Sequence, residues 1–245
     1  DNHAAPNDIF ALEADGLRAL TEATQTEGLI KVPEVLAVGA HFLVLEWVDF
    51  DGAQTARSAQ SLGAGLAAIH QRTAPHFGWH KNNYIGTLPQ HNAPLADPRN
   101  GALFFGERRL LPLATAPRTQ FPAELVHRVE RFCERIDEFL PISEQQPSLL
   151  HGDLWGGNTI TDHTGRPCLI DPAVYCGHRE IDLAMMRLFG GFSPRVFSAY
   201  EETYPTSEGA SHRIELYQLY YLLVHLNLFG SGYLRGVTRS ICTYA

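Results

Sequence analysis

Residues 149–182 read LLHGDLWGGNTITDHTGRPCLIDPAVYCGHREID, and this stretch decides the fold. Two short apolar pieces, 159–161 and 167–170, flank the tetrapeptide DHTG at 162–165. Asp, Thr and Gly at such positions favour a tight turn, because their side chains or their backbone freedom suit reversed chain geometry. The pattern therefore predicts a β-hairpin at this point of the chain.

Three side chains around the predicted hairpin have the chemistry of phosphoryl transfer. Asn158 and Asp171 stand just outside its two ends, so folding brings an amide oxygen beside a carboxylate, a combination that suits Mg²⁺. Asp153 lies in the preceding Gly-rich loop, where a carboxylate could accept a proton from an attacking hydroxyl. Alone, such an Asp is usually a turn former and such an Asn a cap. The combination HGDxxxxN, a hairpin-length gap and a following Asp favours a kinase-like phosphotransferase.

Length and composition restrict the class of protein. The chain has 245 residues, of which 44% are hydrophobic and 19% charged, which suits one large domain or two unequal lobes. A formal net charge of -8 opposes binding to a phosphate backbone and argues against a nucleic-acid partner. No apolar run reaches the roughly 18 residues of a membrane span. The four cysteines lack CxxC spacing and predict buried thiols in a reducing, cytoplasmic compartment.

Periodicity outlines the rest of the chain. Apolar residues at helical spacing predict helices over 8–20, 58–70, 123–140 and 213–229. Runs at 29–38 and 42–48 predict a second hairpin, and residues 49–53 resemble a linker. Segment 73–98, rich in Pro, Asn, His and Gly, is predicted to be a long loop of the kind that often carries function.

The catalytic-loop sequence at 151–158 resembles that of the fructosamine (ketosamine) kinase family, within the wider aminoglycoside phosphotransferase and choline kinase-like group. HGDxxxxN alone indicates only the wider group, and WGG at 155–157 narrows it. Further matches are DPA at 171–173, Tyr175, GHRE at 177–180, DLA at 182–184, FGGF at 189–192, FGW at 77–79, NYIG at 83–86, PQ at 89–90 and FGSGY at 229–233. The resemblance runs over essentially the whole chain.

This resemblance implies an α+β, protein kinase-like fold with two lobes. Residues 1–48 would form the small lobe, truncated at its N-terminus, and residues 49–245 a mainly helical large lobe with the catalytic hairpin and the acceptor site. The family's Gly-rich phosphate loop and its ATP-orienting Lys should lie before Asp1, and Lys31 and Lys81 are in the wrong places to replace that Lys. The chain taken alone is therefore expected to be a poor kinase.

The resemblance also implies roles for residues that bind ATP. Glu13 takes the position of the small-lobe Glu that pairs with the ATP-orienting Lys; without the family it would be an ordinary solvated helix residue. The segment Glu46, Trp47 and Val48 corresponds to the hinge whose backbone bonds adenine; without the family it would be a half-buried strand. Asp153 would be the catalytic base, with Mg²⁺ held by Asn158 and Asp171.

Two residues are candidates for contact with the acceptor. An indole at Trp155, two residues after Asp153, could pack on a sugar ring and attract an amine; the alternative is that Trp155 packs under the loop as core. Arg109 matches a family Arg near the substrate channel, although Gly101 stands where the family usually has a Trp ahead of it. His151 is expected to brace the catalytic loop and not to transfer a proton.

The activity implied by the family is ATP-dependent phosphorylation of a sugar hydroxyl on a ketosamine, either a small molecule or linked to a protein, with no nucleic-acid or membrane partner. The first alternative is a kinase for an aminoglycoside, choline or another amino alcohol, which Trp155 disfavours. The second is a nucleotide-binding pseudo-enzyme, which the intact set of Asp153, Asn158 and Asp171 disfavours. Nothing in the sequence indicates an oligomeric state.

Overall fold

The computed structural model describes residues 6–25, 28–50, 54–116, 121–140 and 146–244. Its described strands form four antiparallel pairs. The pairs are β1 (Val35–Gly39) with β2 (Phe42–Leu45), β3 (Asn83–Ile85) with β4 (Leu88–Gln90), β5 (Ser148–Leu150) with β8 (Tyr175–Gly177), and β6 (Thr159–Thr161) with β7 (Pro167–Leu169). The predicted hairpins are thus confirmed as β6–β7 and β1–β2. The predicted linker at 49–53 falls partly on 51–53, outside the described residues.

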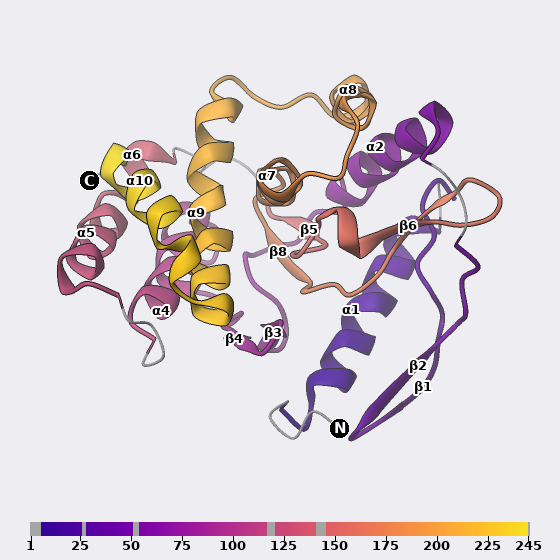
Figure 1. The fold of residues 1–245 in the computed structure, drawn as a ribbon, viewed down its shortest axis with the longest axis horizontal. Coiled ribbons are helices and arrows are strands. Elements are labelled where there is room, and N and C mark those ends of the chain that lie inside the picture. Colours follow the sequence, from indigo (N-terminus) through magenta and orange to yellow (C-terminus); the bar gives the residue numbers. More distant parts are fainter. Residues whose placement is uncertain (1–5, 26–27, 51–53, 117–120, 141–145, 245) are drawn as a thin grey trace.

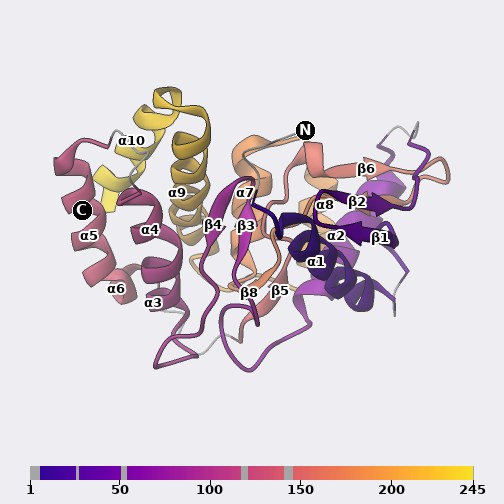
Figure 2. The ribbon, with the colours of Figure 1, turned by 90° about the horizontal axis from the view of Figure 1, so that it is seen from below.

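The N-terminal elements gather at one end of the molecule. Helix α1 (Ile9–Thr24) extends the predicted helix by one turn and buries Leu17 and Leu20. Figure 1 shows α1, β1 and β2 at the side of the molecule opposite the C-terminal helices, and Figure 2 shows the same arrangement from below. The hairpin β6–β7 lies on the α1 side, next to this N-terminal part.

Helices make up most of the remainder. They are α2 (Ala56–His70), α3 (Gly101–Phe105), the π-helical segment η1 (Gly106–Leu110), α4 (Leu111–Ala114), α5 (Ala123–Glu134), α6 (Ile136–Phe139), α7 (Glu180–Phe189), α8 (Pro194–Thr203), α9 (Ala210–Phe229) and α10 (Leu234–Tyr244), with 3₁₀ turns η2 (Gly156–Asn158) and η3 (Ser231–Tyr233). None of the helices in the described part combines the length and apolar character needed to cross a bilayer.

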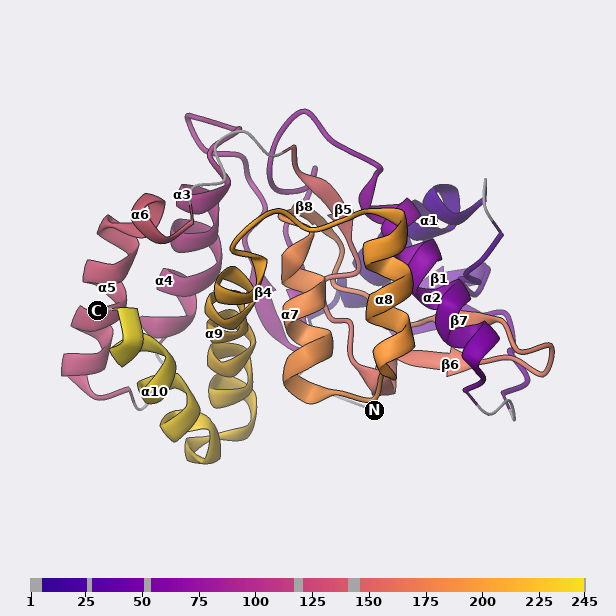
Figure 3. The ribbon, with the colours of Figure 1, turned by 90° about the horizontal axis from the view of Figure 1, so that it is seen from above.

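The pairing of α2 with α8 depends on one glycine. A capping box between Thr55 and Ser58 fixes the start of α2. At Gly63 the two helices approach so closely that a Cβ would lie 2.1 Å from the backbone oxygen of Val196. Side chains larger than hydrogen are therefore excluded at this crossing, which Figure 3 shows with α8 beside α2.

Two predictions about the fold are wrong. The helix predicted over 123–140 ends at Glu134, because Arg135 leaves the helical region with φ -117° and ψ 17°. The break lets the rings of Phe132 and Phe139 meet at 5.4 Å between centroids, whereas seven helical residues would separate them by about 10 Å along the axis.

The loop predicted over 73–98 contains the hairpin β3–β4. Its strands have three residues each and are too short to show an alternation of apolar and polar residues.

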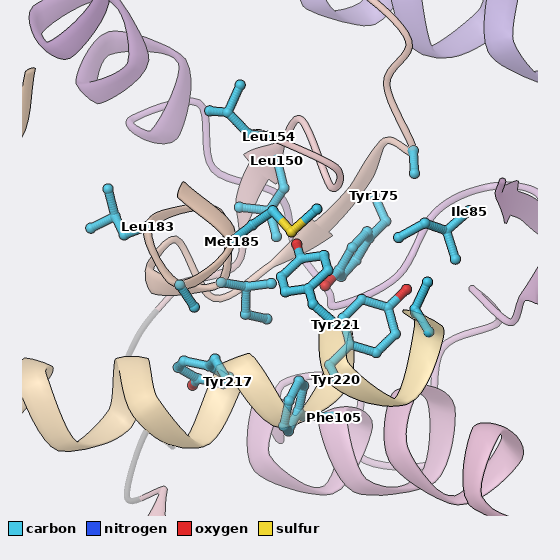
Figure 4. Close-up of a cluster of buried hydrophobic side chains, with 14 of the residues drawn as sticks. Ile85, Phe105, Leu150, Leu154, Tyr175, Leu183, Met185, Tyr217, Tyr220 and Tyr221 are labelled. Atoms are coloured by element: carbon cyan, nitrogen blue, oxygen red, sulfur yellow. The ribbon is translucent and has the colours of Figure 1, made fainter. Parts of the chain in front are cut away.

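The core lies between α9, α7 and the pair β5–β8. Tyr217, Tyr220 and Tyr221 of α9 are almost completely buried. Figure 4 shows Tyr220 and Tyr221 pointing from α9 toward Tyr175 of β8, beneath Leu150. The loop 151–158, which follows β5, therefore begins next to a layer of packed aromatic rings.

Candidate active site

The hairpin β6–β7 brings two predicted metal ligands together. Thr159 pairs with Leu169 at its open end, and the amide of Ile170 donates to the carbonyl of Asn158 at 3.1 Å. The side-chain Nδ2 of Asn158 donates to the backbone oxygen of Asp171 at 3.3 Å. The geometric prediction that these two residues lie side by side is confirmed.

Asp153 joins the same cluster. Asn158 Nδ2 donates to the backbone oxygen of Asp153 at 2.9 Å and to its Oδ2 at 3.3 Å. Burial, followed by the negative charges of Asp171 and Asp182, raises the pKa of Asp153 to about 7, although the Asn158 hydrogen bond opposes the rise. A carboxyl group with this pKa is suited to exchange a proton near neutral pH.

The catalytic loop is held from below by Asp182 of α7. Its two carboxylate oxygens accept from the amides of His151 (2.8 Å) and Gly152 (2.9 Å), and Oδ2 also faces Nε2 of His70 at 3.1 Å. Burial alone would raise the pKa of Asp182, but these hydrogen bonds outweigh it and the pKa lies below its ordinary value. A charged Asp182 thus fixes the two residues before Asp153.

Gly152 could not be replaced without moving this loop. It has φ +83°, and a Cβ there would lie 2.1 Å from the carbonyl oxygen of Ala173. Its own carbonyl accepts from the hydroxyl of Tyr221 at 3.0 Å. The loop is therefore clamped between α9 and the segment that follows Asp171.

His151 acts as a brace. Its Nε2 lies 3.0 Å from the carbonyl of Ile170, and its Nδ1 accepts from the amide of Asp153 at 3.3 Å. The first contact requires a proton on Nε2 and the second a lone pair on Nδ1, so the ring is neutral. Burial lowers the pKa of His151 despite the nearby Asp182. Both ring nitrogens are used inside the protein, and the predicted role in bracing fits this geometry.

Asp171 adopts a strained backbone conformation. Its φ is 53°, the only positive value at a non-glycine position among the described residues, and Pro172 follows it. Such a conformation costs roughly 1–3 kcal/mol and persists only where the surroundings hold it, often at functional sites.

A pocket connects this cluster with the N-terminal helix. About 410 Å³ of space, open to solvent, lies between residues that include Glu13 of α1, Asp153, Asp171, Asn83 and Tyr84. Burial, with the negative charge of Asp171 as a second cause, raises the pKa of Glu13 to about 7. Within the described ranges no cation pairs with Glu13, so the pocket has an acidic wall that would favour a bound cation or cationic side chain.

Segments on both sides of the predicted hinge residues 46–48 are bonded to the hairpin β6–β7. Lys31 exchanges two main-chain hydrogen bonds with the β7 region, from its amide to Pro167 (2.8 Å) and from the amide of Leu169 to its carbonyl (2.9 Å). Past the hinge, the carbonyl of Asp49 accepts from the amide of His163 at 3.1 Å. The segments that flank β1–β2 are thus both bonded to β6–β7.

The three predicted hinge residues differ in exposure. The side chain of Glu46 is bound by Lys31 at 2.5 Å, and its amide donates to Glu34. Trp47 is 77% exposed and its Nε1 donates to Asp49, whereas Val48 is buried. Because the Glu46 side chain is held by Lys31, a ligand here would meet the backbone of 46–48 and not this carboxylate.

The two predicted acceptor residues have different environments. Trp155 is 42% exposed, and its ring covers Gly157, where a Cβ would lie 2.3 Å from Cζ2. The alternative that Trp155 packs as core is therefore wrong. Arg109 is 1% exposed, and its guanidinium lies 3.8 Å from the ring centroid of Tyr175 and donates to Asn92 at 2.7 Å. The structure does not bring Arg109 to the surface of the pocket.

Several residues around the site had no predicted role. Asp182, Tyr221 and Asn83 each reach the catalytic loop or the segment after Asp171 from a distant part of the sequence. Only their membership in matched motifs, DLA for Asp182 and NYIG for Asn83, marked two of them. No local pattern distinguished Tyr221 from the other aromatic residues of α9.

The oxygen donors fit a magnesium ion that is held together with phosphates. Within the described ranges no group of three or more His, Cys, Asp or Glu residues could hold a metal by itself. Mg²⁺ usually takes one or two carboxylates and completes its shell with water and substrate phosphates. Asn158 and Asp171 match this requirement in residue type, because they are adjacent residues with oxygen-bearing side chains, and Asp171 lines the pocket.

Comparison with known proteins gives the same assignment as the sequence motifs. A family model for fructosamine kinase matches residues 1–244. A protein of Enterococcus faecium named "Probable ketoamine kinase" is 39% identical over 230 residues, which cover 92% of this chain and 79% of that protein. The chloroplastic protein-ribulosamine 3-kinase of Arabidopsis thaliana is 36% identical over 235 residues, or 92% of this chain and 68% of the relative.

Solved structures extend the comparison to the fold. A crystal structure assigned as a fructosamine-3-kinase of Thermobifida fusca superposes with a TM-score of 0.87 at 36% identity, covering 100% of this chain and 82% of that one. The choline kinase of Streptococcus pneumoniae has a TM-score of 0.58 at 14% identity, covering 98% and 84%, and shows a shared fold alone. The predicted kinase-like fold and the predicted family are both confirmed. The chain belongs to the fructosamine kinase family.

Proposed function

We propose that this chain catalyses the ATP-dependent phosphorylation of a sugar hydroxyl on a ketosamine, a sugar joined to an amine. The observation that carries the proposal is the cluster in which Asn158 binds both Asp153 and Asp171 at the edge of one pocket. The names of the relatives, ketoamine kinase and protein-ribulosamine 3-kinase, supply the class of acceptor.

Asp153 is the catalytic base in this proposal. The acceptor oxygen forms a bond to the γ-phosphorus of ATP, the bond from that phosphorus to ADP breaks, and the hydroxyl proton passes to the carboxylate of Asp153. A pKa near 7 lets this group take up the proton and return it to solvent within the same pH range. Asn158, by donating to Oδ2 of Asp153, fixes the rotamer of the carboxylate.

Asn158 and Asp171 would hold Mg²⁺ on the triphosphate. The Nδ2 of Asn158 is taken up by Asp153 and Asp171, and no hydrogen bond from the described residues occupies its Oδ1. That oxygen and the carboxylate of Asp171 are the atoms offered to a cation. When bound, Mg²⁺ neutralises phosphate charge that develops during transfer.

The other proposed roles concern the binding of the two substrates. The backbone of Glu46, Trp47 and Val48 binds adenine. Glu13 pairs with a cationic side chain, and that side chain contacts the phosphates of ATP. The half-exposed indole of Trp155 packs on the acceptor sugar and attracts its amine substituent. The acceptor is a small or protein-linked ketosamine, and the enzyme works in the cytoplasm. All four cysteines are free and three are buried, which supports a reducing compartment.

Turnover of the full-length gene product tests the proposal. The assay supplies Mg-ATP with fructosyl- and ribulosyl-amines, the matching free sugars, an aminoglycoside and choline. Ketosamines should be the preferred acceptors, and Asp153→Asn should lower turnover roughly 10²–10⁴-fold with ATP binding retained. Preference for the aminoglycoside or choline would overturn the acceptor class, and absence of turnover with every acceptor would favour a nucleotide-binding pseudo-enzyme. A D153N rate within threefold of the parent would remove Asp153 from its role.

A further inference from the structure

A network of buried polar side chains lies directly behind Asp171. Its members come from β3, β4, the loop after β4, η1 and α9, and none is more than 7% exposed. They are Asn83, Gln90, Asn92, Arg109 and Tyr220. Only Asn83 also lines the pocket that contains Asp153 and Asp171. The catalytic roles proposed above do not use any of the five.

The donors and acceptors of this network are fixed, because the guanidinium of Arg109 can only donate hydrogen bonds. Nη2 of Arg109 donates to Oδ1 of Asn92 at 2.7 Å, which turns Nδ2 of Asn92 toward Oδ1 of Asn83 at 2.7 Å. The hydroxyl of Tyr220 donates to Oε1 of Gln90 at 2.7 Å, and Nε2 of Gln90 donates to the same Oδ1 of Asn83 at 2.8 Å. With its oxygen accepting both bonds, Asn83 presents Nδ2 as the donor on its other side.

The side-chain amides of Asn83 and Gln90 both donate to backbone carbonyls in the segment after Asp171. Asn83 Nδ2 donates to the carbonyl of Val174 at 2.8 Å, and Gln90 Nε2 also donates to the carbonyl of Ala173 at 3.1 Å. On the opposite side the amide of Ala173 donates to the carbonyl of His151 at 2.9 Å. The chain is thus held from two sides within three residues of the strained Asp171 backbone.

We propose that Asn83 and Gln90 are positioning residues for the Asp171 carboxylate, an inference that rests on the proposed role of Asp171 as a magnesium ligand. The backbone at Asp171 has a positive φ that a non-glycine residue does not keep by itself. The two amide hydrogen bonds fix the carbonyls that follow, and with them the direction in which the Asp171 side chain leaves the chain. Partners that orient a metal ligand in this way typically change metal affinity when they are replaced.

The test measures metal binding and does not depend on turnover. Asn83→Leu and Gln90→Met keep the approximate shape of each side chain and remove its hydrogen bonds. Asn227→Leu is the matched control, because Nδ2 of Asn227 also donates to backbone carbonyls, of Leu113 (3.1 Å) in α4 and Leu223 (2.9 Å) in α9, and neither belongs to the segment after Asp171. MnCl₂ is titrated into the full-length gene product with ADP present, and free Mn²⁺ is followed by electron paramagnetic resonance.

N83L and Q90M should weaken Mn²⁺ binding roughly 10–100-fold, whereas N227L should change it less than threefold and adenosine binding should be unchanged throughout. Asp171→Asn is measured in parallel. If D171N weakens Mn²⁺ binding but N83L and Q90M lower only the melting temperature, the inference is overturned and the proposed function stands. If D171N leaves Mn²⁺ binding unchanged, the proposed metal role fails and the inference fails with it.

A milder variant covers the case in which N83L does not fold. Tyr220→Phe removes only the hydroxyl that orients Gln90 and leaves the ring in the core. Threefold or greater weakening of Mn²⁺ binding in Y220F, together with a larger effect in Q90M, would support the proposal. Unchanged Mn²⁺ binding in both variants would overturn it.

Discussion

Replacing Asp153 with asparagine is expected to stabilise the folded protein at pH 8, although it removes the proposed base. Burial, with the negative charges of Asp171 and Asp182, raises the pKa of Asp153 from 3.8 to about 7. Between these values the folded protein binds a proton that the unfolded chain does not, so the free energy of unfolding falls as the pH rises. The loss is complete above pH 7, where both states are charged.

The size of the effect follows from the two pKa values. Each pH unit between them corresponds to about 1.36 kcal/mol, so the wild type is destabilised relative to low pH by roughly 4 kcal/mol at pH 8, where the folded protein buries the charge. At pH 4.5 the loss is about 1 kcal/mol, because the folded protein keeps a proton that most unfolded chains have released. Asparagine has no charge to bury, and its Oδ1 can still accept from Asn158. D153N should exceed the wild type in stability by these amounts.

Urea unfolding of both proteins at pH 8 and pH 4.5 measures the difference. Asp182→Asn is the matched control with the opposite sign, because the pKa of Asp182 is lowered and its charge stabilises the loop above its unfolded pKa. D182N should therefore be less stable than the wild type by a similar amount at both pH values, because the stabilisation by the Asp182 charge is lost only as the pH falls below the unfolded pKa of 3.8. A D153N protein no more stable than wild type at pH 8, or a difference independent of pH, would refute the burial argument.

Three further substitutions test other parts of the site and the fold. Trp155→Ala should weaken use of a ketosamine by roughly 1–2 kcal/mol, seen as a raised KM with the KM for ATP unchanged; an equal loss for the matching free sugar would contradict a contact with the amine. Gly152→Ala places a Cβ 2.1 Å from the carbonyl of Ala173 at φ +83°, so more than about 1 kcal/mol of unfolding free energy should be lost, and an unchanged urea midpoint would be inconsistent with this strain. Gly63→Ala forces α2 from α8 and should cost roughly 1–3 kcal/mol in the same assay, whereas Gly232→Ala, with open space around it, should cost less; equal costs would argue against the close approach.

The catalytic hairpin could be predicted because its information is local. Oδ1 of Asp162 accepts from the amides of Thr164 and Arg166, both at 2.9 Å, so the turn is made by the residues that signalled it. Once this turn is fixed, the adjacency of Asn158 and Asp171 follows from strand geometry alone. The same reasoning explains why the ends of α2 and α9 were predicted to within a few residues.

Features that depend on distant contacts could not be predicted from spacing. The strand β4 contains Pro89 and consists of three residues, so its pairing with β3 shows no alternation that a pattern could detect. Arg109 carries a charge that usually marks a surface, yet its place is decided by the ring of Tyr175 and by Asn92, which no local rule brings together. Likewise, the role of Asp182 depends on amides that precede it by about thirty residues.

The hydrogen bonds from Lys31 and Asp49 to the hairpin β6–β7 bear on the length of nucleotide that the proposed site would accept. The backbone proposed to meet adenine is fastened on both sides to the same hairpin that carries Asn158 and Asp171 at its open end. The same hairpin therefore fixes the distance between the proposed adenine site and the proposed metal ligands, and forms one frame for both. Under the proposed roles, this fixed span would match a nucleotide to the site by its length as well as by its charge.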